Sequence, residues 1–174
     1  MCIRDSYIAI NPDIKLPEFN RNNNWMYNKS NLKPLKFKFL ADLENPKYRN
    51  VFYRPEITYN LYDGISPGIN LINRGIKNRP LSFEIFSQYA SKEKKLIGSA
   101  NFRYQLNNEI DNNYSTLFNF FYTTNHYNEN LRYQVFSPSV IINFRDNKNL
   151  RSNVKKSISI SCLLYTSPSP RDPT

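Results

Sequence analysis

Hydrophobic and polar residues alternate one by one along most of the chain after position 33. Leu35, Phe37 and Phe39, for example, alternate with Lys36 and Lys38. The same alternation recurs in 51–61, 81–89, 96–106, 114–122, 131–144 and 158–160. Successive side chains of a strand point to opposite faces, so each segment becomes a strand with one apolar and one polar face. The sequence therefore predicts an all-β antiparallel meander over residues 33–161, with about seven or eight strands.

The segments are separated by turn-forming clusters, which lie at 91–95, 107–113, 125–130 and 145–149. A further structural turn is predicted at Tyr62, Asp63 and Gly64, continuing to Pro67 and Gly68, because Asp and Gly favour turn positions. Residues 7–32 are polar and rich in Pro and Asn, and read as an arm or linker.

The apolar positions change phase around Pro138. They are odd before it (131, 133 and 135) and even after it (140, 142 and 144). A bulge or bend near Ser137 is expected to restore one continuous apolar face.

The two faces fit a β-sandwich, a soluble barrel or a membrane barrel. The predicted strands are long, whereas globular strands run about 5–6 residues and tilted membrane strands roughly 9–11. This length favours a partial outer-membrane-type β-barrel over a soluble sheet. Its expected lipid-facing residues are Phe83, Ile85, Tyr89, Phe102, Tyr104, Phe118, Phe120 and Tyr122, and its expected lumen-facing residues are Glu84, Gln88, Asn101, Arg103 and Gln105. The soluble alternative stays open.

The two ends of the chain resemble translated sequencing-adapter sequence. The stretch CLLYTS at 162–167 can be encoded as TGT CTC TTA TAC ACA TCT, and the reverse complement of this DNA encodes the opening MCIRD. Such an inverted repeat is similar to a transposon end. Residues 1–6 and 162–174 are therefore expected to be adapter-derived, and the remainder to be an internal piece of a longer protein. Both cysteines, Cys2 and Cys162, lie in these ends, so no disulfide framework is expected.

Composition limits the chemistry further. The formal net charge of +10 and the 15% of aromatic residues raise the question of nucleic-acid binding. The cationic and aromatic residues alternate on opposite faces, however, and a stacking platform needs both on one face, so nucleic acid is disfavoured.

No catalytic, cofactor or metal site is predicted. The only histidine, His126, lies in a turn cluster, and a zinc site needs three or four ligands. Glu56 and Glu84 are expected to pair with a cation such as Arg54 or Arg103. Nucleophile-elbow and phosphate-loop motifs are absent from the sequence.

Two stretches carry a family resemblance: VFYRPEITYNLYDGISPGINLINRGI at 51–76 and PLSFEIFSQYASKEKKLIGSANFRYQL at 80–106. They resemble the C-terminal β-barrel-like region of gluzincin-type aminopeptidase-related proteins of Bacteroidota, particularly marine flavobacteria, a region shared with surface-antigen-type outer-membrane proteins. The resemblance covers about residues 43–161. It implies an outer-membrane segment joined to a zinc peptidase domain in the full protein. The HExxH helix of that domain is absent here, so no peptidase activity carries over.

The expected function is a structural or anchoring role in the outer membrane of a Gram-negative bacterium, without catalysis. The lipid bilayer and the rest of the parent polypeptide are the expected partners. The alternative is a soluble β-sandwich or barrel that serves as an accessory or binding module of a secreted or surface metallopeptidase, in the periplasm or at the cell surface.

Overall fold

The computed structural model describes residues 7–13, 15–18, 21–27, 33–40, 44–74, 79–107, 113–128, 131–145 and 154–166. Its strands are β1 (Tyr7–Ala9), β2 (Trp25–Tyr27), β3 (Leu35–Phe39), β4 (Arg49–Asn60), β5 (Gly64–Ile72), β6 (Leu81–Ala90), β7 (Lys95–Asn107), β8 (Asn113–Asn128), β9 (Leu131–Phe144), β10 (Lys156–Ser161) and β11 (Leu164–Thr166). These ranges contain no helix, and therefore no helix long and apolar enough to cross a membrane. The all-β prediction is confirmed.

The chain forms two compact units, Met1–Tyr53 and Arg54–Thr174, and the boundary lies within β4. In the first unit, β1 and β2 form an antiparallel pair. They lie within the stretch predicted to be a polar arm. The strand β3 runs parallel to the first residues of β4, from Leu35 opposite Arg49 to Phe39 opposite Tyr53. This parallel pair departs from the antiparallel meander that the alternation predicts, because alternation defines faces and not strand direction.

An aromatic cluster surrounds a lysine in the first unit. The Lys47 ammonium lies 4.2 Å from the ring centroid of Tyr7 and 5.3 Å from that of Trp25, a cation–π arrangement. The Tyr27 hydroxyl donates a 2.9 Å hydrogen bond to the Lys47 carbonyl. A hydrogen bond with Tyr7 raises the pKa of Lys47 above its ordinary value, and burial raises the pKa of Tyr27.

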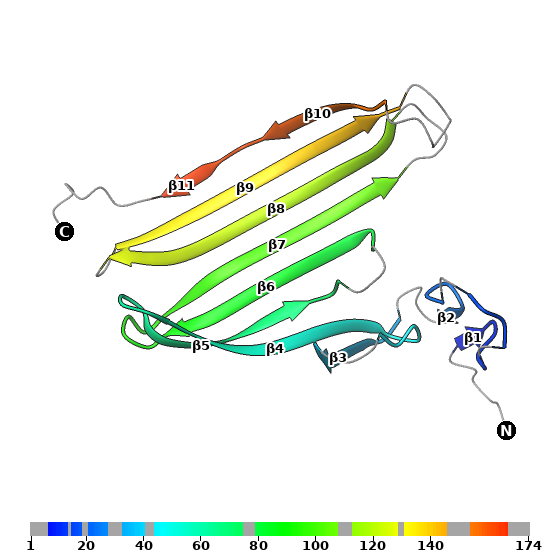
Figure 1. Cartoon of the computed structure of the whole chain (residues 1–174), viewed down its shortest axis with the longest axis horizontal. Coiled ribbons are helices and arrows are strands. Elements are labelled where there is room, and N and C mark those ends of the chain that lie inside the picture. Colours follow the sequence, from blue (N-terminus) through cyan, green and yellow to red (C-terminus); the bar gives the residue numbers. More distant parts are fainter. Residues whose placement is uncertain are drawn as a thin grey trace. The chain divides into compact units, whose positions relative to one another are not determined.

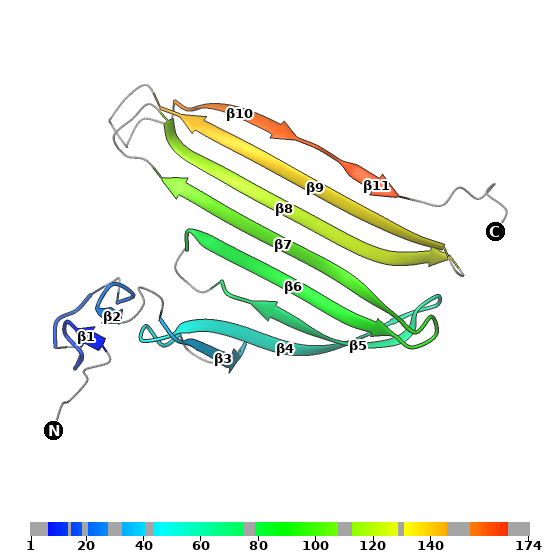
Figure 2. The same cartoon turned by 180° about the vertical axis from the view of Figure 1, so that it is seen from behind.

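In the second unit the strands follow one another in a single antiparallel sheet, in the order β10-β9-β8-β7-β6-β5-β4 (Figures 1 and 2). The short strand β11 pairs with β9 beyond the end of β10. The strands are long: β6 has 10 residues, β7 has 13, β8 has 16 and β9 has 14. The sheet is not closed into a barrel by the strands that are described, as expected for a partial barrel.

Register gives this sheet one apolar and one polar face. Phe83, Phe102 and Phe120 lie opposite one another on adjacent strands, as do Glu84 and Asn101 on the other side of the pleat. The apolar face is defined here by the outward apolar positions Ile57, Tyr59, Ile65, Ile69, Leu71, Leu81, Phe83, Ile85, Tyr89, Leu96, Phe102, Tyr104, Leu106, Phe118, Phe120, Tyr122, Phe136, Val140, Ile142, Ile158 and Ile160.

The burial of side chains is inverted relative to a soluble protein. Among the described residues the buried hydrophobic side chains are Val51, Phe52, Ala90 and Ile97, while the buried polar ones are Asn24, Asn50, Asp63, Ser66, Asn70, Asn73, Ser82, Gln88, Ser115, Thr124 and His126. Most large residues of the apolar face are exposed; Tyr59 is 72% exposed and Phe120 45%. Hydrophobic side chains are normally the most buried class. In the second unit, however, the buried hydrophobic residues among those described are only Ala90 and Ile97. The second unit therefore has no ordinary apolar core.

The turn between β4 and β5 is shorter than predicted. It spans 61–63 and ends at Gly64, whose φ of 71° lies in the left-handed region that glycine favours. Pro67 and Gly68 do not belong to the turn, because both lie within β5. Regular pairing with β6 begins at Gly68 opposite Gln88, so the missing N–H of Pro67 precedes this ladder.

The bulge predicted near Ser137 is wrong. Ser137 and Pro138 pair with Phe121 and Phe120 in unbroken register, and the register shifts of this strand pair lie elsewhere, near the two ends of β8. The apolar positions of β9 instead change face: Tyr133 and Val135 share the polar-face parity of Asn119. Of the predicted turn clusters, the residues 108–112, 129–130 and 146–149 lie outside the described part.

Candidate functional site

The polar face of the second unit carries its chemistry. Strand register places Ser82, Arg103, Asn119 and Ser139 in one row across β6, β7, β8 and β9. The next row along the strands contains Glu84 and Asn101. The lumen-facing prediction therefore groups residues that do share one face: Glu84, Gln88, Asn101, Arg103 and Gln105.

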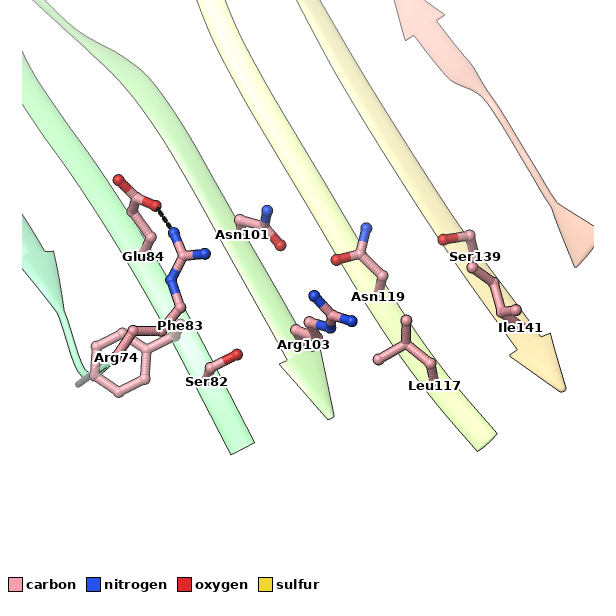
Figure 3. A pocket seen from close by; sticks show the side chains of 10 residues that line it. All are labelled: Arg74, Ser82, Phe83, Glu84, Asn101, Arg103, Leu117, Asn119, Ser139 and Ile141. Atoms are coloured by element: carbon pink, nitrogen blue, oxygen red, sulfur yellow. Dashed lines mark hydrogen bonds and ion pairs between the residues drawn. The ribbon is translucent and has the colours of Figure 1, made fainter. Parts of the chain in front are cut away.

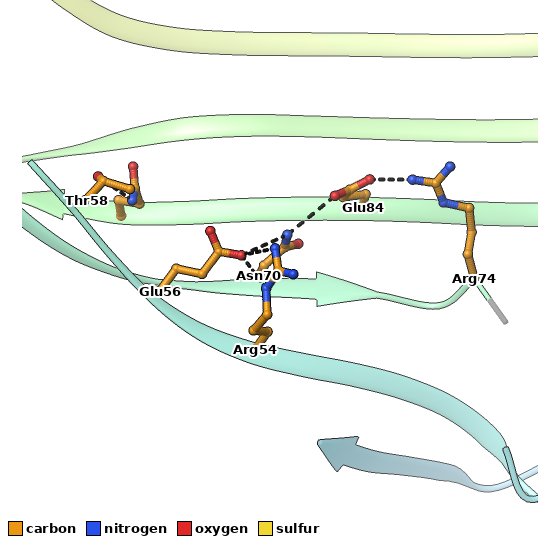
Figure 4. A network of polar contacts seen from close by, with 7 residues as sticks. Arg54, Glu56, Thr58, Asn70, Arg74 and Glu84 are labelled. Carbon is orange, nitrogen blue, oxygen red and sulfur yellow. Dashed lines mark hydrogen bonds and ion pairs between the residues drawn. The ribbon is translucent and has the colours of Figure 1, made fainter. Parts of the chain in front are cut away.

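A line of charged groups crosses β4, β5 and β6 on this face (Figure 4). Arg54 pairs with Glu56, as expected from the sequence. Glu84 pairs with Arg74 at 2.5 Å, and not with Arg103. The Asn70 amide lies between the two carboxylates, 3.5 Å from Glu56 and 3.4 Å from Glu84. Each carboxylate thus has its own guanidinium, and the line as a whole is electrically balanced.

Gly68 lets a side chain pass across β5. The Gln88 amide of β6 donates a 2.8 Å hydrogen bond to the Thr58 hydroxyl of β4. A Cβ on Gly68 would lie 2.5 Å from the Gln88 Cγ and 2.5 Å from the Ser87 carbonyl oxygen, which is closer than real Cβ atoms approach. The glycine therefore permits this polar contact between two strands that are not neighbours.

A pocket of about 240 Å³ lies beside the charged line. It is lined by Arg74, Ser82, Phe83, Glu84, Asn101, Arg103, Leu117, Asn119, Ser139 and Ile141 (Figure 3). Figure 3 shows Arg103 between Asn119 and Ser82, with Glu84 held by Arg74 at the other side. Arg103 has no hydrogen bond or ion pair with any residue that the structure describes.

A buried Asp–His pair joins distant parts of the second unit. The Asp63 Oδ1 lies 2.5 Å from His126 Nδ1, and their side chains are 2% and 0% exposed. Asn60 donates a 3.1 Å hydrogen bond to the other carboxylate oxygen, and Lys92 N donates one to the Asp63 carbonyl. The pair thus ties the β4–β5 turn to the far end of β8, and the backbone hydrogen bond of Lys92 ties the same turn to the β6–β7 turn.

The prediction that His126 lies in a turn cluster is wrong, because His126 belongs to β8 and is buried. Asp63 does lie in the predicted turn, but the sequence did not indicate its contact with His126. No spacing signal links residues this far apart. His126 Nε2 has no hydrogen-bond partner among the described residues. Within the same residues no group of His, Cys, Asp and Glu could hold a metal ion.

The predicted lipid-facing residues also share a face. Phe83 packs against Phe102 with ring centroids 6.2 Å apart, and Tyr104 against Phe118 at 6.5 Å. Tyr89, Phe102, Tyr104, Phe120 and Tyr122 are exposed, whereas Phe83, Ile85 and Phe118 are half-buried. A face of this kind can bind an apolar medium or another apolar surface.

Comparisons with known proteins add no family: no family model, no curated protein and no solved structure matches this chain.

Proposed function

We propose that the second unit is part of a β-barrel wall in the outer membrane of a Gram-negative bacterium, with a structural or anchoring role. Its apolar face would contact lipid, and its polar face would line a hydrated interior. The rest of the parent polypeptide would supply the strands that complete the wall. The resemblance to aminopeptidase-related proteins motivates an anchoring role for an attached domain.

The observation that carries this proposal is the inverted burial of the sheet. Contiguous exposed apolar patches of more than a few hundred Å² are rare on soluble monomers, and here apolar side chains cover one face of β4 to β10. Lipid satisfies such a face without a second protein layer. The alternation of apolar outward and polar inward residues is the ordinary arrangement of a membrane barrel.

Two further features support the proposal. The strands β6 to β9 have 10 to 16 residues, enough for tilted strands that need roughly 9–11 residues to cross the hydrocarbon region. The polar face is internally bonded through Arg54–Glu56, Asn70 and Arg74–Glu84. A hydrated interior tolerates such charges, because the unpaired faces of these groups remain in water.

Solubility tests the proposal directly. The full chain is expressed with and without a sugar-headgroup detergent, and its state is measured by size-exclusion chromatography and far-UV circular dichroism. We expect a folded β protein only with detergent or lipid vesicles, and aggregation in plain buffer. A monodisperse folded monomer in plain buffer would overturn the membrane assignment and favour the soluble accessory module.

A further inference from the structure

The pocket around Arg103 contains a guanidinium whose charge nothing in the described residues balances. Three charged side chains line the pocket: Arg74, Glu84 and Arg103. Glu84 is engaged by Arg74 at 2.5 Å and by the Asn70 amide at 3.4 Å. Its carboxylate therefore does not compensate Arg103, and the pocket keeps a local positive charge.

The neighbours of Arg103 are hydrogen-bond donors. In the row across the sheet, the Ser82 hydroxyl lies on one side of Arg103, and the Asn119 amide and the Ser139 hydroxyl lie on the other. Figure 3 shows these side chains on the same face of the sheet, with Asn119 next to Arg103 and Ser139 one strand further away. The side chains of Ser82, Asn119 and Ser139 make no hydrogen bond within the part of the chain that the structure describes, so the Asn119 amide beside Arg103 is available to a ligand.

We propose that this pocket binds a small oxyanion, a phosphate or a carboxylate group, through Arg103. The guanidinium presents its donors as a planar fork that matches two oxygens of such a group. The Asn119 amide, on the strand next to Arg103, supplies a further donor to a remaining oxygen. Glu84 and Arg74 form the wall beside the site, where the Glu84 carboxylate opposes the binding of an anion. Leu117 and Ile141 form an apolar side of the pocket.

The site does not depend on what covers the apolar face, because all of its groups lie on the opposite face of the sheet. It would form on the wet side of a membrane barrel or on the surface of a soluble sheet. Failure of the oxyanion proposal and failure of the membrane proposal are therefore separate results.

Phosphate titration tests the site on the full chain. The protein is folded in an uncharged sugar-headgroup detergent, which brings no phosphate of its own, or in plain buffer if it is soluble there. Inorganic phosphate is added at constant ionic strength, and the arginine Nε–Hε NMR signals are followed. A parallel titration with acetate separates phosphate from carboxylate binding.

We expect saturable binding of one anion, with the Arg103 signal moving most. Arg103→Gln should weaken it by about tenfold or more, since hydrogen bonds to a charged group carry much of the affinity. Arg103→Lys keeps the charge without the planar fork, so its affinity for phosphate should lie between those of the unaltered chain and Arg103→Gln. Glu84→Gln removes the opposing carboxylate and should tighten binding.

Arg54→Gln is the matched control, because it removes the same charge from the same face outside the pocket. The affinity of the Arg54→Gln variant for phosphate should stay within about twofold of that of the unaltered chain, since distant exposed charges are largely screened. Circular dichroism checks that each variant is folded. Non-saturable binding, equal affinity for Arg103→Gln and the unaltered chain, equal losses in Arg103→Gln and Arg54→Gln, or weaker binding by Glu84→Gln would each overturn the proposal.

Discussion

Phe102→Arg places a charge at the centre of the apolar face. Phe102 lies on β7, which runs from Lys95 to Asn107, and is 41% exposed. At about 3.3 Å per residue, it is about 23 Å from one end of the strand and about 17 Å from the other. A strand tilt of roughly 40° projects these lengths to about 18 Å and about 13 Å along the membrane normal. In a bilayer, Phe102 would therefore lie within a few Å of the midplane.

The magnitude follows from comparison with Phe102→Ala. Both substitutions remove the ring that packs against Phe83 at 6.2 Å between centroids, a contact worth ~0.5–1.5 kcal/mol. Only arginine adds a charge. At the midplane of a membrane barrel that charge costs ~2–4 kcal/mol. In water it would cost almost nothing, because the aliphatic stem of arginine lies along the sheet while its charge stays solvated.

The free energy of unfolding is measured by urea titration of the full chain in phosphatidylcholine vesicles, followed by far-UV circular dichroism. Phe102→Arg should be less stable than Phe102→Ala by ~2–4 kcal/mol. Arg103→Ala, one residue away on the opposite face, should change stability by less than ~0.5 kcal/mol. Equal stabilities of the two Phe102 variants, or a loss in Arg103→Ala as large as in Phe102→Arg, would refute the assignment of the faces.

Three further predictions concern the contacts inside each unit. Asp63→Asn and His126→Ala should each lower the free energy of unfolding by ~1–3 kcal/mol, because each leaves a buried polar partner unsatisfied. The double variant should lose less stability than the sum of the two single losses. Additive losses in urea unfolding would contradict an interaction between the two side chains. Gly68→Ala should cost ~1–3 kcal/mol through overpacking against the neighbouring strand, and a neutral result in the same assay would show that β5 and β6 can separate there. Lys47→Met should lower the urea midpoint reported by fluorescence of Trp25, the only tryptophan. The pKa of Lys47 is raised in the folded state, so its stabilising contact should persist below pH ~10.4 and fade as the pH rises further. A difference in urea midpoint between Lys47→Met and the unaltered chain that does not change with pH would argue against this contact.

The buried polar residues give the sheet its internal order. Gln88 reaches across Gly68 to Thr58, and Asn70 lies between Glu56 and Glu84. In an ordinary globular domain, apolar packing would hold these strands in register. In this unit, main-chain pairing and polar contacts do so, which leaves the apolar residues free to contact an external medium.

The sequence alone determined that the chain is all-β and which residues of β6, β7 and β8 share a face, although it misassigned the first half of β9. Alternation is a local property of the pleat, so Phe102 and Arg103 are assigned to opposite faces without knowledge of any partner. The Arg54–Glu56 pair was also predictable, because residues two apart on a strand share a face. The parallel direction of β3 was not, since faces carry no information on strand direction.

Only the tertiary structure decided which groups on a face meet. Alternation gives His126 the same parity as Phe120 and Tyr122, and yet it is buried against Asp63, sixty-three positions earlier in the chain. Likewise Glu84 pairs with Arg74 at the end of β5 and leaves Arg103 uncompensated. Such contacts depend on the curl of the sheet and the placement of its turns, which bring together residues that no periodicity relates.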